Sequence, residues 1–119
     1  MFFRCIRSPI NLFHARINGC QHIGTFVLQK NSLSGADVDC FIAHQANRRI
    51  IVATAERLKM PREKVIINID RYGNTTAGTI PLAMQTAVDE GKLKKGSLVL
   101  LAAVGAGFTS GATLLHWAY

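Results

Sequence analysis

His44 and Asn74 are the two side chains whose types and spacing point most directly to chemistry. His44 opens the run His44-Gln45-Ala46-Asn47, Asn74 lies in Gly73-Asn74-Thr75, and each run follows an apolar segment. A neutral imidazole and a carboxamide each offer an N–H donor, and two donors held together can polarise a carbonyl and stabilise the enolate formed from it. The sequence therefore predicts half of an active site, because no nucleophile is evident beside these residues.

The elements that would position these side chains alternate between strands and helices. We expect strands at 38–43, 65–69 and 97–104, helices at 46–60 and 78–90, and a final strand or strand pair at 109–117. Pro61 ends the first helix, Gly91 ends the second, and Thr75 or Thr76 would cap the second. The order strand-helix-strand-helix-strand-strand predicts an α/β fold with a mixed sheet, in which parallel strands are followed by one antiparallel strand.

Three features would meet at one edge of such a sheet, because sites in open α/β sheets form beyond the carboxyl ends of the strands. His44 ends the first expected strand, Asn74 follows the second, and the turn Gly105-Ala106-Gly107 follows the third. Each has an ordinary structural explanation by itself, since strand-end histidines are often structural and Gly-Asn is a common turn. Their convergence favours a site.

Composition limits the class of protein. The chain has 119 residues, of which 49% are hydrophobic and 18% charged, and this balance is typical of one globular domain. No apolar run reaches the length of about 18 residues needed to span a bilayer. The net charge of +7 favours an acidic partner, or else reflects an ordinary solvated surface. No repeat typical of nucleic-acid binding is present.

The three cysteines, Cys5, Cys20 and Cys40, are odd in number and irregular in spacing. They indicate neither a disulfide framework nor a metal site, and they favour a reducing compartment. Cys40 lies in an apolar strand, where a small core residue is the ordinary interpretation.

Residues 1–24 differ from the rest of the chain. They contain Arg4, Arg7 and Arg16 and no acidic residue, because the first acid is Asp37. We expect a disordered or non-native leader over 1–24, with an organelle transit peptide as the alternative, and a folded domain over 25–119.

From about Val38 to its carboxyl end, the chain resembles the carboxyl-terminal half of 3-oxoacyl-acyl-carrier-protein synthase III, the ketoacyl synthase that begins fatty-acid synthesis. The resemblance is carried by His44-Gln45-Ala46-Asn47, Arg49-Ile50, Asp70-Arg71-Tyr72-Gly73-Asn74-Thr75, Pro81-Leu82-Ala83, Gly105-Ala106-Gly107-Phe108-Thr109 and Gly111. It implies a thiolase-like fold of two similar halves, of which this chain holds the second, and a cytoplasmic location.

The resemblance also implies a mechanism with a Cys-His-Asn triad. The cysteine is acylated from a coenzyme A thioester, and His44 and Asn74 match the residues that bind the thioester carbonyl of malonyl-acyl carrier protein and promote its decarboxylation. The carbanion then attacks the acyl-cysteine. No metal or permanently bound cofactor is implied, because acyl-coenzyme A and the phosphopantetheine of acyl carrier protein are substrates.

Other positions match binding residues of the family. Gly105, Ala106 and Gly107 match a loop that contributes a backbone N–H to a second oxyanion hole, although Ala106 replaces a glycine found in many relatives. Asn47 matches a residue that binds the pantetheine arm, and capping a helix is its alternative role. Arg49, with Arg48 beside it, matches a patch that docks acyl carrier protein, and a solvated helix face is the alternative.

The chain departs from the family in lacking the nucleophile. None of its three cysteines occupies the expected small-residue turn at a helix start. We therefore expect the isolated chain not to condense acyl groups without the missing amino-terminal half or a homodimer partner. The alternatives are a non-catalytic carrier-protein-binding fragment and a related condensing enzyme, either a hydroxymethylglutaryl-coenzyme A synthase or a polyketide starter synthase.

Overall fold

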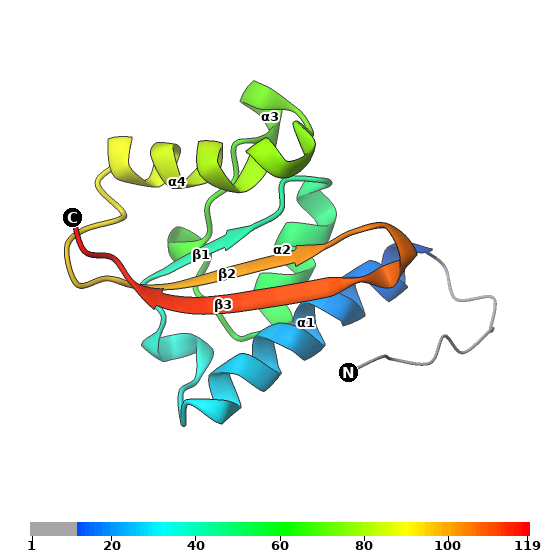
Figure 1. Ribbon diagram of the computed structural model, residues 1–119, viewed down its shortest axis with the longest axis horizontal. Coiled ribbons are helices and arrows are strands. Elements are labelled where there is room, and N and C mark those ends of the chain that lie inside the picture. The colour runs from blue at the N-terminus through cyan, green and yellow to red at the C-terminus, as the bar shows by residue number, and fades with distance from the viewer. Residues whose placement is uncertain (1–11) are drawn as a thin grey trace.

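A three-stranded mixed sheet forms the centre of the protein, and the computed structural model describes residues 12–119 (Figure 1). The strands lie in the order β1 (Cys40–Ala43), β2 (Leu98–Val104) and β3 (Ser110–His116). β1 pairs with β2 in parallel, and β2 pairs with β3 antiparallel. The mixed α/β fold class predicted from the sequence is confirmed.

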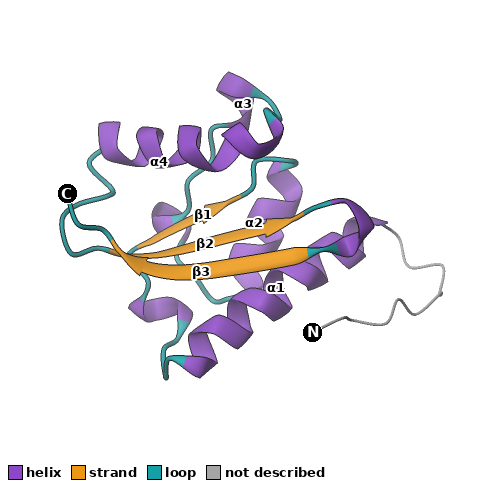
Figure 2. Cartoon of the chain, in the orientation of Figure 1, coloured by secondary structure: helices purple, strands orange, loops and turns teal. Residues whose placement is uncertain are grey.

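Helices cover the two faces of the sheet (Figure 2). α1 (Leu12–Lys30) precedes β1, and the crossover from β1 to β2 carries α2 (Arg48–Arg57), α3 (Ile69–Tyr72) and α4 (Thr79–Asp89). Among the described residues, none of the helices combines the length and the apolar character that crossing a membrane would require.

Strand alternation divides the core into two clusters, because successive side chains of a strand point to opposite faces. Phe41 and Leu100 pack with residues of α1 and α2 in one cluster. Cys40 and Val99 pack with residues of α4 in the other. All four residues of β1 are buried, which explains why this strand is continuously apolar rather than alternating.

The strand predicted at residues 65–69 is wrong. Only Val65 forms a bridge, parallel to Phe41, and Ile69 already begins α3. The Ile66 amide donates to the Phe41 carbonyl at 3.0 Å, so the segment starts to pair with β1 and then leaves it. The segment is apolar because Val65 and Ile66 are buried, and that burial does not require a continuous ladder.

The leader expected over 1–24 overlaps α1 from residue 12 onward. Residues 12–24 belong to α1, and Cys20 in this helix is buried. The Arg57 side chain of α2 donates to the side-chain oxygen Oδ1 of Asn18 at 2.5 Å, which links the two helices. Residues 1–11, and with them Cys5, lie outside the described residues.

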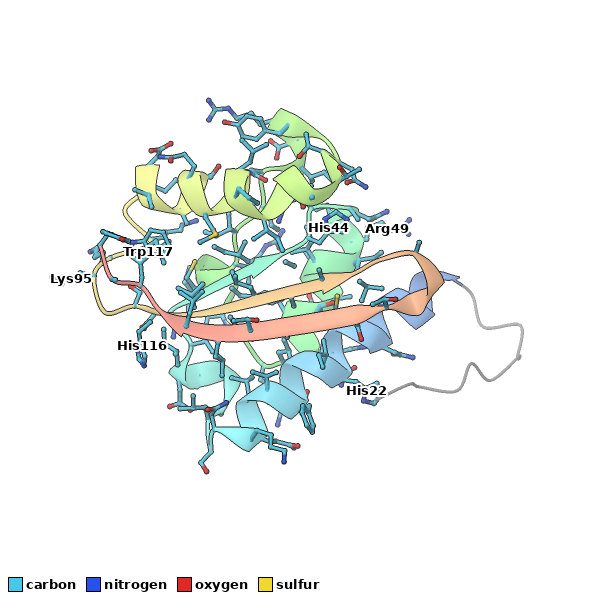
Figure 3. The ribbon with its side chains drawn as sticks, in the orientation of Figure 1. His22, His44, Arg49, Lys95, His116 and Trp117 are labelled. Atoms are coloured by element: carbon cyan, nitrogen blue, oxygen red, sulfur yellow. The ribbon has the colours of Figure 1, made fainter. Side chains whose placement is uncertain are left out.

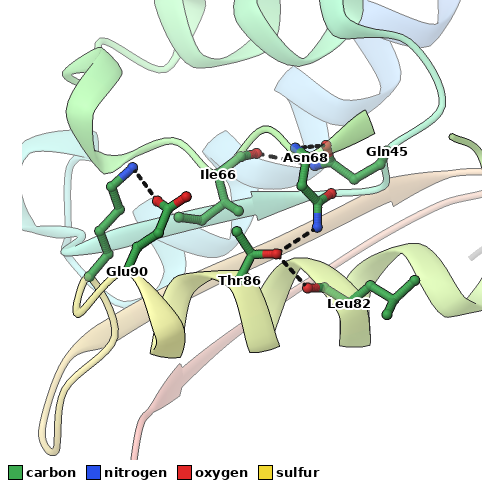
Figure 4. Close-up of polar contacts among 7 residues, drawn as sticks. Gln45, Ile66, Asn68, Leu82, Thr86 and Glu90 are labelled. Carbon is green, nitrogen blue, oxygen red and sulfur yellow. Dashed lines mark hydrogen bonds and ion pairs between the residues drawn. The ribbon is translucent and has the colours of Figure 1, made fainter. Parts of the chain in front are cut away.

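Where the backbone ladder between β1 and the segment from Val65 stops, the Gln45 side chain forms the hydrogen bonds that connect the two (Figure 4). Its side chain is fully buried, and Nε2 donates to the carbonyls of Ala43 at 2.9 Å and Ile66 at 3.1 Å. Its Oε1 accepts from the Asn68 amide at 3.1 Å. One carboxamide therefore joins the end of β1 to the segment that leads into α3.

This hydrogen-bond network extends to α4 through Asn68, which is also buried. The Asn68 Nδ2 donates to Thr86 Oγ1 at 2.9 Å, and that hydroxyl donates to the Leu82 carbonyl at 3.0 Å. The network therefore fixes α4 against the carboxyl end of β1.

We expect Gln45→Leu to lower the free energy of unfolding by about 2–3 kcal/mol, because it keeps the volume and leaves buried backbone groups without their partner. Urea denaturation followed by circular dichroism measures this change. Gln85→Leu is the matched control, since Gln85 is exposed and bonds to Asp89 within α4. Equal losses in the two variants would contradict the role given to the Gln45 carboxamide.

Candidate functional site

His44 continues the alternation of β1 one residue beyond its end. Its amide donates to the Ala102 carbonyl at 2.8 Å, which extends the ladder with β2. The ring therefore falls on the face of Cys40 and Ile42, which is the face covered by α4. There the half-buried ring places Nδ1 2.5 Å from Oγ1 of Thr79, the first residue of α4.

Asn74 lies on the surface in the loop between α3 and α4. Its Oδ1 accepts a hydrogen bond from the Thr76 amide at 3.0 Å, which is an Asx turn. Because the oxygen is held by the backbone, the orientation of the amide is fixed and Nδ2 is the donor that it presents.

Thr76 connects the two candidate donors. Its amide binds Asn74, and its carbonyl accepts from Thr79 Oγ1 at 3.1 Å. The His44 ring is therefore linked to the Asn74 side chain by three hydrogen bonds and by the covalent backbone of Thr76 between the second and the third. Thr76 adopts φ 54°, a left-handed conformation that costs a β-branched residue about 1–3 kcal/mol and is typical of functional loops.

The capping role predicted for Thr75 or Thr76 is wrong. The N-cap of α4 is Gly78, and neither threonine side chain caps a helix in this loop. Thr75 and Thr76 are of a residue type that suits a cap, and no sequence pattern predicts a role for Thr79. The available signal was the position of Thr79 at the start of a helix that packs on the His44 face.

The turn at 105–107 follows β2 at the same end of the sheet as His44, because β1 and β2 are parallel. Only Gly107 needs a left-handed conformation, with φ 68°, and Ala106 does not. The methyl group of Ala106 therefore causes no backbone strain. The Gly105 amide donates to the Thr109 carbonyl at 2.8 Å, so this N–H is engaged within the turn.

Asn47, Arg48 and Arg49 lie at the start of α2. Asn47 is the N-cap, and its side-chain oxygen accepts from the Arg49 amide at 2.9 Å, so the capping alternative for this residue is observed. Both arginine residues are exposed. Figure 3 shows Arg49 at the same end of the molecule as His44, with Lys95 and His116 at the opposite end.

The two described cysteines are unsuited to nucleophilic attack. Cys20 and Cys40 are buried and unpaired, and burial raises the pKa of each thiol to about 11. A thiol with that pKa stays protonated at neutral pH, whereas the thiolate is the nucleophile. Within residues 12–119, no group of three or more His, Cys, Asp or Glu side chains is placed to hold a metal ion.

Comparison with known proteins decides the family. Residues 28–117 match the family described as 3-oxoacyl-[acyl-carrier-protein (ACP)] synthase III C terminal. The chain belongs to this family.

The relatives of the chain agree with this family. The β-ketoacyl-[acyl-carrier-protein] synthase III of Koribacter versatilis is 76% identical over 109 residues, covering 92% of this chain and 33% of the relative. The synthase III of Solibacter usitatus is 58% identical over 93 residues, covering 78% of this chain and 28% of the relative.

A solved structure gives the same result for the fold. The 3-oxoacyl-[acyl-carrier-protein] synthase III from Aquifex aeolicus superposes with a TM-score of 0.86 at 45% identity, covering 89% of this chain and 34% of that one. The fold is thiolase-like, as the sequence resemblance implied. The chain spans about a third of the length of these synthase III relatives, which is less than the half that the resemblance suggested.

We expect protonation of Cys40 to stabilise the folded chain in a pH-dependent way. The pKa rises from 9.0 to about 11 on folding, so this stabilisation is complete below pH 9.0 and is lost as pH rises through about 11. The measurement is the free energy of urea unfolding across that range for the parent chain and for Cys40→Val. The difference removes the contribution of lysines and tyrosines, and parallel pH profiles would contradict the burial effect.

Proposed function

We propose that this chain forms the part of a 3-oxoacyl-acyl-carrier-protein synthase III that binds and decarboxylates the malonyl thioester. The observation that carries the proposal is the hydrogen-bond chain joining His44 to Asn74 at the carboxyl end of the sheet. Identity of 76% to a synthase III over 92% of the chain supports this family chemistry over that of the related condensing enzymes.

The reaction needs hydrogen-bond donors more than it needs a base. Loss of carbon dioxide from a malonyl thioester breaks a carbon–carbon bond and moves the electron pair toward the thioester oxygen as an enolate. Each well-placed donor stabilises that charge by about 2–4 kcal/mol. The Asn74 amide presents Nδ2 because Oδ1 is occupied, and a carboxylate at this position would repel the enolate.

Condensation also needs an acylated cysteine, and this chain does not supply one from its described residues. In the proposed reaction an acyl-coenzyme A starter acylates a cysteine on the part of the synthase that this chain does not span, or on a partner subunit. The turn at 105–107 then contributes a backbone N–H near the acyl carbonyl, and Asn47 contacts the pantetheine arm. No permanent cofactor takes part, and the reaction takes place in the cytoplasm.

We expect His44→Ala and Asn74→Ala each to slow malonyl-thioester decarboxylation by about 10²–10³-fold, since each removes one donor to the developing oxyanion. The assay uses a chimaera in which this chain replaces the matching third of the Koribacter versatilis synthase, chosen for its 76% identity. Release of carbon dioxide from malonyl-acyl carrier protein is measured.

Gln85→Ala in the same chimaera is the control, because Gln85 lies exposed on α4 and bonds to Asp89 in the same helix. An unchanged rate in either donor variant would refute the role of that residue. The isolated chain, assayed beside the chimaera, should show no condensation of acetyl-coenzyme A with malonyl-acyl carrier protein.

A non-catalytic docking role is the second candidate, and the charges at the start of α2 favour it. Arg48 and Arg49 stand in the first turn of α2, which contains no acidic residue. Basic residues there oppose the helix dipole, at a cost of about 0.3–1 kcal/mol each. An acidic carrier protein bound at this end would offset that repulsion, and the net charge of +7 acts in the same direction.

We expect Arg48→Glu and Arg49→Glu each to weaken binding of holo-acyl carrier protein by about tenfold or more, because each reverses a charge facing an acidic partner. Lys95→Glu makes the same charge change at the opposite end of the molecule and should have little effect (Figure 3). Isothermal titration calorimetry at two salt concentrations measures the affinities. Equal weakening by all three variants would indicate general charge attraction instead of a docking site.

A further inference from the structure

The Thr79 hydroxyl has one hydrogen and two neighbours that compete for it. Oγ1 lies 2.5 Å from His44 Nδ1 and 3.1 Å from the Thr76 carbonyl oxygen. The carbonyl can only accept, whereas the imidazole nitrogen donates or accepts according to its tautomer. The position of this hydrogen therefore decides whether His44 Nδ1 acts as donor or as acceptor in its contact with Thr79.

The Thr79 hydroxyl can point its hydrogen at the Thr76 carbonyl or at His44 Nδ1, and these two arrangements complete different numbers of hydrogen bonds around the hydroxyl. If the hydroxyl donates to Thr76, it accepts from a protonated Nδ1, and both contacts are satisfied. If it donates to Nδ1 instead, the contact with the Thr76 carbonyl carries no hydrogen. Thr79 is only 2% exposed, so water does not readily replace a lost bond at its side chain.

We propose that Thr79 is a positioning residue that holds the neutral His44 ring in the tautomer with its proton on Nδ1. Thr79 achieves this by accepting from Nδ1 while donating to the Thr76 carbonyl. Thr76, in its left-handed conformation with φ 54°, contributes to this arrangement, because its carbonyl accepts from Thr79 and its amide donates to Asn74. The same relay therefore orients both candidate donors.

This tautomer has a consequence for catalysis, which rests on the proposed function. A neutral ring with its proton on Nδ1 has a lone pair on Nε2, and a lone pair repels an enolate oxygen. His44 donates from Nε2 only after the ring gains a second proton, which Nε2 accepts from the solvent to give an imidazolium. The neutral imidazole donor expected from the sequence is thereby replaced by a charged one, and no redox partner or additional reactant is needed.

The tautomer is measured directly by ¹⁵N nuclear magnetic resonance of the histidine rings in the 119-residue chain. A bare ring nitrogen resonates far downfield of a protonated one, so the spectrum of the neutral ring, reached at the upper plateau of a pH titration, reports which nitrogen carries hydrogen. The signals of His44 are identified by their absence in His44→Ala. We expect the Nδ1-protonated form to exceed the other by about tenfold in the parent chain.

Two variants separate the hydroxyl from the packing of the side chain. Thr79→Val keeps the shape and removes the hydroxyl, and we expect it to shift the neutral ring toward the Nε2-protonated form. Thr79→Ser keeps the hydroxyl and should restore the parent tautomer. Circular dichroism confirms that each variant is folded.

The parent spectrum decides the proposal even if Thr79→Val does not fold. A neutral His44 with its proton on Nε2 would overturn it, and so would an unchanged tautomer in a folded Thr79→Val. Because the spectrum needs no substrate, this result is independent of the decarboxylation assay. An inactive donor pair with the Nδ1 tautomer intact would refute the proposed function alone.

Discussion

The buried carboxamide of Gln45 is the interaction on which this end of the sheet depends. The backbone ladder between β1 and the 65–68 segment ends after one bridge, and the Gln45 side chain completes it with three hydrogen bonds. A buried polar group in a low-dielectric interior is stabilising only when its partners are present. The carboxamide therefore specifies the path of the chain as well as stabilising it.

That path sets the geometry of the candidate site. Gln45 follows His44 directly, so fixing the Gln45 side chain on one face fixes the ring of His44 on the other. The Asn68–Thr86 bond holds α4 against the same face and so places Thr79 at the ring. The buried Gln45 and the half-buried candidate residue His44 are thus neighbours in sequence, and the first orients the second.

The elements that could be predicted from the sequence are those whose own residues determine them. β2 and β3 are apolar runs bounded by turn residues, and α2 and α4 have helical periodicity with recognisable ends, so these four lie close to the expected ranges. The position of His44 at a strand end followed in the same way. The family followed from motifs whose order and spacing are rare by chance.

The elements that could not be predicted depend on contacts distant in sequence. Residues 65–69 have strand composition, and only the Gln45 side chain, some twenty positions earlier, shows why the ladder stops. Residues 12–24 lack clear periodicity, and the bond from Arg57 of α2 to Asn18 is a contact that their own sequence does not indicate. Thr79 has no motif of its own, because its role arises when the fold brings it to a ring 35 positions away.

The left-handed Thr76 places a locally strained residue in the loop that holds Asn74. Gly73 and Gly78 lie in the same loop, and Gly73 adopts its positive φ without strain. Threonine at position 76 is strained, yet its backbone binds Asn74 on one side and Thr79 on the other. Donors held in place beforehand stabilise a developing charge without reorganising at the moment of reaction. A strained residue that rigidly joins two candidate donors is therefore better explained by a demand on their geometry than by the stability of the loop.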